Sequence, residues 1–78
     1  MAYITSLTPG QVHAITQNVV YALPSRRCMV HADAVVEVNT VSGTTGWDAL
    51  TGANTVGAET AAAFIRCTTG NTNVSVKV

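Results

Sequence analysis

Two histidines and two cysteines are the side chains in this 78-residue sequence that could supply acid–base, nucleophilic or metal chemistry. A structural zinc site needs closely spaced ligands, and neither an H-x₃-H nor a C-x₂-C arrangement occurs around His13, His31, Cys28 or Cys67. His31 follows Cys28 by three positions, which in a strand places the two side chains on opposite faces. The sequence therefore predicts no metal site and no cofactor.

Catalysis is not expected either. A nucleophilic cysteine needs a base within hydrogen-bond reach and a group that orients this base, and no neighbour marks either cysteine as activated. The acidic residues are scattered singly along the chain. The glycines lack the Lys-Ser/Thr pair of a phosphate-binding loop and fit turns better; they are Gly43, Gly46, Gly52 and Gly57. We expect no catalytic residues and predict that the protein is not an enzyme.

The two cysteines are too few for a disulfide framework. Two buried, apolar thiols are one interpretation. A Cys28–Cys67 disulfide is the other, if the strands that carry these residues are neighbours. The sequence leaves both open.

Charge is scarce in this chain. Charged residues make up 10% of it and the net charge is zero, whereas ordinary soluble domains carry about 25% charged residues. The polar surface must be built from Thr, Asn, Ser and Gly, which is typical of a surface that neighbouring subunits cover or that must be inert. No basic stripe is present to neutralise phosphates, so we expect no nucleic-acid partner.

The ends and apolar stretches contain no targeting pattern. The first ten residues have neither a basic region nor an apolar run of signal-peptide length, so secretion is not expected. The apolar stretch at residues 32–38 is interrupted by Asp33 and Glu37. It is too short and too charged to span a bilayer, and we expect no membrane partner.

A period of two residues is the main structural signal. At residues 73–78, Val74, Val76 and Val78 alternate with polar residues, and Val36 and Val38 alternate in the same way. Residues 60–68 form a nearly continuous apolar run, which predicts one central strand covered on both faces. Residues 69–72 have hairpin chemistry and predict a hairpin between this strand and the C-terminal strand.

Shorter segments complete a prediction of six to seven strands. Strands are expected at residues 17–23, 27–32 and 47–51, with residues 14–20 open to a helical turn instead. Residues 2–7 are either a further strand or part of an extended arm within residues 1–10. Turn signals every 8 to 12 residues predict a single all-β domain over residues 1–78, a small antiparallel β-sandwich or barrel.

Core and contact residues follow from this pattern. The predicted core consists of Val36, Val38, Trp47, Phe64, Ile65, Val74 and Val76. Trp47 is alternatively an exposed platform for stacking a sugar or an anchor at an interface. The candidate contacts with other subunits or a shell are Tyr3, Ile4, Arg26 and Arg27, because an extended terminus can add a strand to a neighbour and arginine is favoured at interfaces.

One recurring pattern of strand and turn residues resembles a known class of proteins. It comprises VEVN at residues 36–39, GWDALTG at 46–52, AFIRCT at 63–68 with Gly70, VSVK at 74–77, and ALPSR at 22–26. This pattern is similar to small β-sandwich structural proteins of tailed bacteriophages. The resemblance covers about the C-terminal half of the chain and the segment at 22–26.

The resemblance implies a virion component without enzymatic activity. The first expectation is a capsid decoration (cement) protein that binds the outer shell as an oligomer, commonly a trimer, and stabilises it. Its partners would then be other copies of itself and the major capsid protein or another virion protein, and its location the virion, after assembly in the host cytoplasm. The alternatives are a small tail-associated structural protein, or a carbohydrate- or surface-binding β module that uses Trp47.

Overall fold

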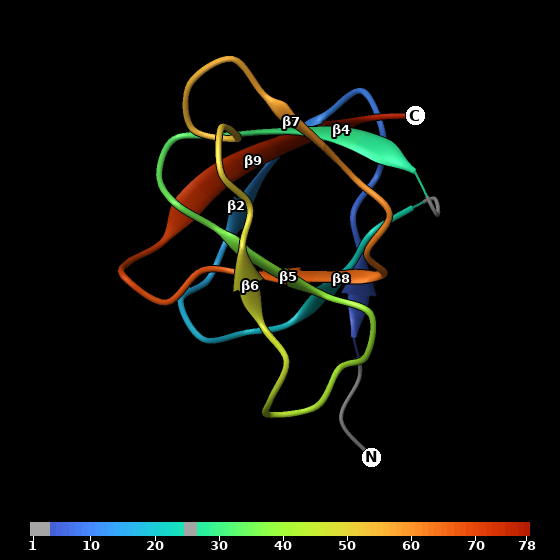
Figure 1. The fold of residues 1–78 in the computed structure, drawn as a ribbon. Helices are drawn as coiled ribbons and strands as arrows, with labels where there is room; N and C mark the ends of the chain where they lie inside the picture. The colour runs from blue at the N-terminus through green and yellow to red at the C-terminus, as the bar shows by residue number, and fades with distance from the viewer. Residues whose placement is uncertain (1–3, 25–26) are drawn as a thin grey trace.

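The computed structural model describes residues 4–24 and 27–78, and these residues form two β-sheets that lie one on the other (Figure 1). The sheets contain nine short strands: β1 (Thr5–Ser6), β2 (Val12–Ile15), β3 (Tyr21–Ala22), β4 (Cys28–Ala32), β5 (Glu37–Asn39), β6 (Asp48–Ala49), β7 (Ala58–Thr60), β8 (Phe64–Arg66) and β9 (Thr72–Lys77). The five-stranded sheet has the order β1-β3-β8-β5-β6, and the four-stranded sheet the order β2-β9-β4-β7.

The all-β sandwich predicted from the sequence is confirmed, with nine strands in the described residues instead of six to seven. All neighbouring strands are antiparallel except β1 and β3, which run parallel. The extra strands come from two-residue ladders such as β1, β3 and β6, which are too short to produce a visible alternation in the sequence.

The core fills the space between the two sheets. Strand β9 shows why: Thr72, Val74 and Val76 are buried, whereas Asn73 and Lys77, at the alternate positions, are exposed. Alternate side chains of a strand point to opposite faces, so one face of β9 meets the core and the other meets solvent. The largest fully buried side chains are those of Ile15, Ile65, Val30, Val36, Val74, Val76 and Cys67.

The single central strand predicted over residues 60–68 is wrong. The chain there forms two strands in different sheets, β7 in the four-stranded sheet and β8 in the five-stranded one. Between them the N–H of Ala62 donates to the hydroxyl of Thr60 (3.1 Å), and the N–H of Ala63 donates to the carbonyl of Asn39 (3.1 Å). These bonds turn the chain from one sheet to the other, and in this short connection Ala62 is buried while Ala61 and Ala63 are exposed.

The hairpin predicted around residues 69–72 is also absent, because β8 and β9 belong to different sheets. β9 pairs instead with β2 and β4. The connection from β8 to β9 is held by the segment after β2: the side-chain amide of Gln17 donates to the carbonyl of Thr68 (2.8 Å), and the N–H of Asn18 donates to the carbonyl of Cys67 (2.8 Å). A loop with hairpin residues therefore serves as a crossover between layers.

The N-terminal part of the described chain is integrated into the fold. β1 extends the five-stranded sheet, and Leu7, immediately after it, is only 2% exposed and donates its N–H to the carbonyl of Ala22 (2.9 Å). The alternative of a helical turn near residues 14–20 is not realised. β2 ends at Ile15, and a tight turn follows in which Asn18 adopts a positive φ of 64°.

Within the described residues the structure contains strands and turns and no helix, so it has no helix of the length and apolarity that crossing a membrane would require.

Candidate functional site

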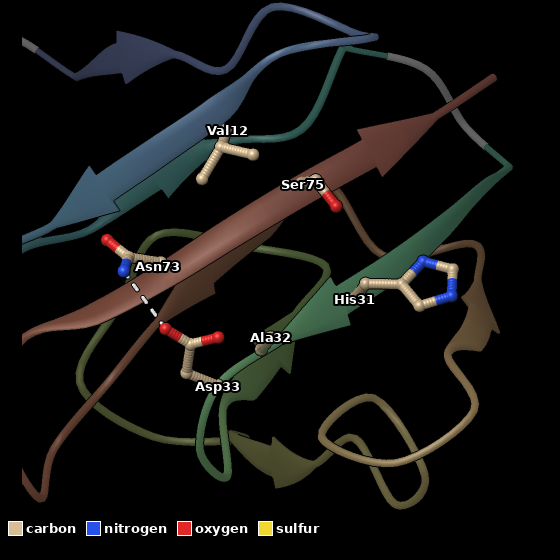
Figure 2. A pocket seen from close by; sticks show the side chains of 6 residues that line it. All are labelled: Val12, His31, Ala32, Asp33, Asn73 and Ser75. Atoms are coloured by element: carbon tan, nitrogen blue, oxygen red, sulfur yellow. Dashed lines mark hydrogen bonds between the residues drawn. The ribbon is translucent and has the colours of Figure 1, made fainter.

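The outer face of the four-stranded sheet carries a shallow depression of about 120 Å³ (Figure 2). It is lined by Val12, His31, Ala32, Asp33, Asn73 and Ser75. The strand register brings these residues together, because Ser75 on β9 lies opposite both Val12 on β2 and His31 on β4. At one end, the side-chain amide of Asn73 donates a hydrogen bond to Oδ2 of Asp33 (2.9 Å).

A serine, a histidine and an aspartate on one face suggest a nucleophilic triad, but their geometry does not form one. In the described part of the chain no hydrogen bond joins His31 to Ser75 or Asp33, and Figure 2 shows the imidazole pointing away from Asp33 and Asn73. A general base must be within hydrogen-bond reach of the group it activates. The depression therefore offers polar contacts to a partner but no assembled nucleophile.

The imidazole of His31 packs over the backbone of Gly57. A Cβ atom placed on Gly57 would come within 2.5 Å of Nε2 of His31, closer than real Cβ contacts allow. Gly57 also has a positive φ of 92°, a conformation that favours glycine. The backbone conformation alone therefore favours glycine, and a Cβ here would also require the exposed His31 ring to move.

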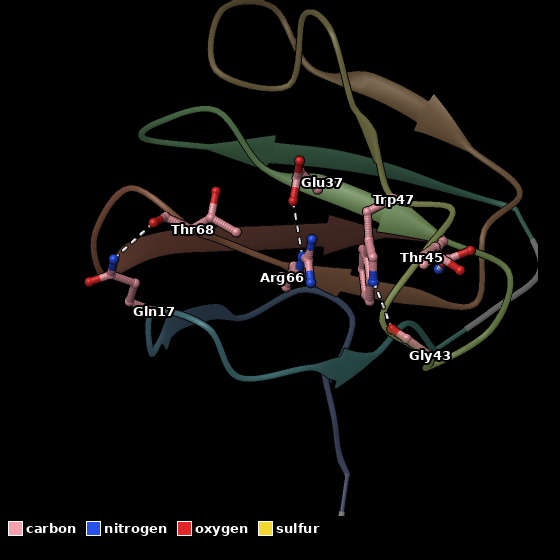
Figure 3. A network of polar contacts seen from close by, with 8 residues as sticks. Gln17, Glu37, Gly43, Thr45, Trp47, Arg66 and Thr68 are labelled. Carbon is pink, nitrogen blue, oxygen red and sulfur yellow. Dashed lines mark hydrogen bonds and ion pairs between the residues drawn. The ribbon is translucent and has the colours of Figure 1, made fainter.

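A second polar cluster covers part of the outer face of the five-stranded sheet (Figure 3). Ile65 at the centre of β8 points into the core and is fully buried, so its neighbours Phe64 and Arg66 point outward and are half-buried. Glu37 on β5 lies directly opposite Arg66, and Nε of Arg66 donates to Oε1 of Glu37 (2.9 Å). The guanidinium of Arg66 also lies 4.3 Å from the centre of the Trp47 ring.

The loop at residues 40–46 fixes the tryptophan in this cluster. The indole N–H of Trp47 donates to the carbonyl of Gly43 (2.8 Å), and the side-chain amide of Asn39 donates to the carbonyl of Thr45 (2.8 Å). Gly46 has a positive φ of 87°, and its α-carbon faces the Asn39 side chain so closely that a Cβ would lie 3.3 Å from Oδ1. Hydrogen bonds to the carbonyls of Gly43 and Thr45 therefore fix the conformation of this loop.

Trp47 and Phe64, predicted as core residues, need a correction. Both are half-buried on the outer face of the five-stranded sheet and lie outside the buried cluster. The reason is the register, since Ile65 takes the inward position of β8, and the indole is held outside by its hydrogen bond to Gly43 and its contact with the Arg66 guanidinium. Of the other predicted core residues, Val36, Ile65, Val74 and Val76 are buried between the sheets, and Val38 is half-buried against them.

Of the four candidate contact residues, the structure describes two, Ile4 and Arg27. Tyr3 and Arg26 fall outside the described residues. Ile4 is half-buried directly before β1. Arg27 is exposed before β4, and its Nε lies 3.4 Å from Oε1 of Glu59.

The remaining histidine is bound locally. Nε2 of His13 accepts a hydrogen bond from the N–H of Thr8 (2.9 Å) and lies 3.2 Å from the carbonyl oxygen of the same residue. The ring therefore ties β2 to the segment that precedes it. Across residues 4–24 and 27–78, no group of three or more His, Cys, Asp or Glu side chains is placed to hold a metal ion.

Both cysteines are buried and reduced, which answers the question that the sequence left open. Burial raises the pKa of the Cys28 thiol, because it disfavours the charged thiolate. The thiol of Cys67 is 3.8 Å from the carbonyl oxygen of Ile15. Cys28 is thus kept in its unreactive form.

Comparisons with protein-family models, with curated proteins and with solved structures give no match. Function must therefore be inferred from the surface and the fold alone.

Proposed function

We propose that this protein is a non-enzymatic structural protein of a tailed-phage virion, and that it decorates the outer capsid shell and stabilises it. The observation that carries this proposal is the way in which the chain neutralises its own charges. Within residues 4–24 and 27–78, the ion pairs Arg66–Glu37 and Arg27–Glu59 join four of the eight charged side chains of the sequence. A surface with little unbalanced charge does not repel further copies of itself, whereas freely diffusing proteins are usually kept apart by net charge.

Exposed apolar side chains support the same proposal. Several exposed positions where a polar residue would fit are occupied by valine, among them Val12 (71% exposed), Val41 (57%) and Val56 (83%). A cement protein occupies many equivalent positions, so contacts that are weak singly become effective when many copies bind one lattice. A rigid sandwich with neutral, partly apolar surfaces suits this task.

The proposal is tested on particles. Purified phage particles that carry this protein are compared with particles from which its gene has been deleted, by heating and by dilution into low osmolarity. Decoration predicts that particles without the protein release their DNA at lower temperature, and that re-adding the purified protein restores the resistance. Equal resistance of both particle types would contradict cementing.

A tail-associated structural role is the alternative within the same class, and the position of the protein in an electron-microscopy map of the particle separates the two.

A surface-binding module is a further alternative, because Trp47 lies at the surface and not in the core. One face of its ring faces the guanidinium of Arg66, so a sugar would stack on the opposite face. This alternative predicts glycan binding that is lost in Trp47→Ala, and no glycan binding by the native protein would exclude it.

A further inference from the structure

The edge strands of the two sheets differ in how well they are protected. An edge strand exposes unpaired backbone N–H and C=O groups, and natural proteins blunt such edges with short strands, charges, bulges or cover. β1 and β6 are two residues long, and β6 carries Asp48. β7 carries Glu59, which pairs with Arg27. Short length or charge therefore protects these three edges from pairing with another strand.

β2 is the exception. It is the longest of the four edge strands, with four residues, and it has no charged residue and no proline. Val12 on its outer face is 71% exposed and Ala14 is exposed beside it. In an antiparallel ladder, alternate residues of an edge strand direct their backbone groups away from the sheet. β2 therefore presents backbone donors and acceptors next to an uncovered apolar side chain.

The chain around β2 is also uncharged. All the Lys, Arg, Asp and Glu residues of the protein lie between positions 26 and 77, and the first 25 residues contain none. Two copies can thus bring their β2 edges together without placing like charges opposite each other. Such repulsion is the usual barrier to self-pairing of edges.

We propose that β2 pairs antiparallel with β2 of a second copy of this chain, so that the two four-stranded sheets become one continuous sheet. The pairing is two-fold and centred on His13, which places Val12 of each copy opposite Ala14 of the other. The ladder covers residues 11–15. It ends at Ile15 because the N–H of Thr16 is already donated to the hydroxyl of Tyr21 (2.9 Å).

The faces of the strand restrict the register. Ile15 is buried and His13 is half-buried, so both belong to the inner face, while Val12 and Ala14 belong to the outer face. Only registers that oppose residues of the same face keep both cores intact. Among these, pairing centred on His13 aligns all of residues 11–15 with the second copy, and it covers the exposed Val12 with a side chain of that copy.

The experiment compares the native protein with two double variants by sedimentation velocity over a dilution series. In Val12→Lys with Ala14→Lys, the introduced lysines of the two copies face each other across the interface, and we expect the dissociation constant of the dimer to rise by at least about tenfold. In Val12→Lys with Ala14→Glu, each introduced lysine faces an introduced glutamate of the second copy, and we expect the association to return. Both positions are exposed, and thermal unfolding of each variant checks that the fold is retained.

Met29→Lys is the matched control. Met29 lies on the same outer face of the same sheet, 36% exposed, but on the inner strand β4. Edge pairing predicts that this variant associates like the native protein. A native protein that is monomeric at every concentration would overturn the proposal, as would a Lys–Glu variant that behaves like the Lys–Lys variant, or dissociation by Met29→Lys alone. Shell binding by a monomeric protein would refute edge pairing and leave the proposed decoration role intact.

Discussion

Arg66 and Glu37 stand directly opposite each other on β8 and β5, and Nε of Arg66 donates a hydrogen bond to Oε1 of Glu37 across 2.9 Å. Their side chains are 26% and 28% exposed, whereas those of the other ion pair, Arg27 and Glu59, are 77% and 57% exposed. Water screens an exposed pair strongly, so only the Arg66–Glu37 pair is expected to contribute measurably to stability.

Replacing Arg66 with alanine should lower the free energy of unfolding by about 1–3 kcal/mol, because the change removes a charge-assisted hydrogen bond and the cation over the Trp47 ring. Urea unfolding followed by the fluorescence of Trp47 measures the loss. The native-state emission should also shift to the red as water reaches the ring.

Arg27→Ala is the control for this prediction, and it should change stability by less than about 1 kcal/mol. Equal losses in the two variants would show that partial burial does not distinguish the pairs.

Gly57→Ala should destabilise the protein by about 1–3 kcal/mol, because alanine is disfavoured at a φ of 92° and the imidazole of His31 must leave its position to admit the Cβ. Gly57→Ala combined with His31→Ala should recover the part of the loss caused by the collision and not the part caused by the backbone. Thermal unfolding of the single and double variants separates the two parts, and an additive result would rule out the collision.

Leu7→Ala should cost about 2–5 kcal/mol, because Leu7 is almost fully buried and anchors the chain that follows β1. In the Leu7→Ala variant, the backbone amides of residue 7 and of β3 should exchange their hydrogens faster than those of β9. Val41→Ala, at an exposed loop position, is the matched control and should leave stability nearly unchanged. A loss as small as that of the control would mean that the segment is not held by Leu7.

Cys28 should make stability depend on alkaline pH. In the folded protein burial raises the pKa of its thiol, so the thiol keeps its proton at pH values where the unfolded chain, with a thiol pKa of about 8.5, loses it. The stabilisation is complete below the unfolded pKa and is lost as the pH rises above it. Urea unfolding between neutral and alkaline pH should show a shallower decline for Cys28→Ala than for the native protein. Identical declines would exclude Cys28 as the source.

The alternation of β9 was predictable from the sequence because this strand has one face in the core and one in solvent, so its valines recur at every second position. The run at residues 60–68 was not predictable in the same way. Alanine fits an exposed connection as well as a buried strand, so the apolar run at residues 61–63 did not reveal that the chain changes sheets there.

The outward position of Trp47 could not be predicted from the sequence either. A lone tryptophan in a small β protein is expected to fill the core, but here the hydrogen bond to Gly43 and the contact with Arg66 hold it outside. The hydrogen bond to Gly43 is local to the loop, whereas the place of Arg66 depends on the register between β5 and β8, which sets it opposite Glu37, 29 positions away. The pairing of Asp33 with Asn73 depends in the same way on β4 lying beside β9.

The most direct test of the proposed role is an electron-microscopy map of phage particles that carry this protein. Capsid decoration predicts density of the size of this sandwich at regularly repeated positions on the outer surface of the shell, and loss of that density when the gene is deleted. Particles whose shell density is unchanged by the deletion would contradict it.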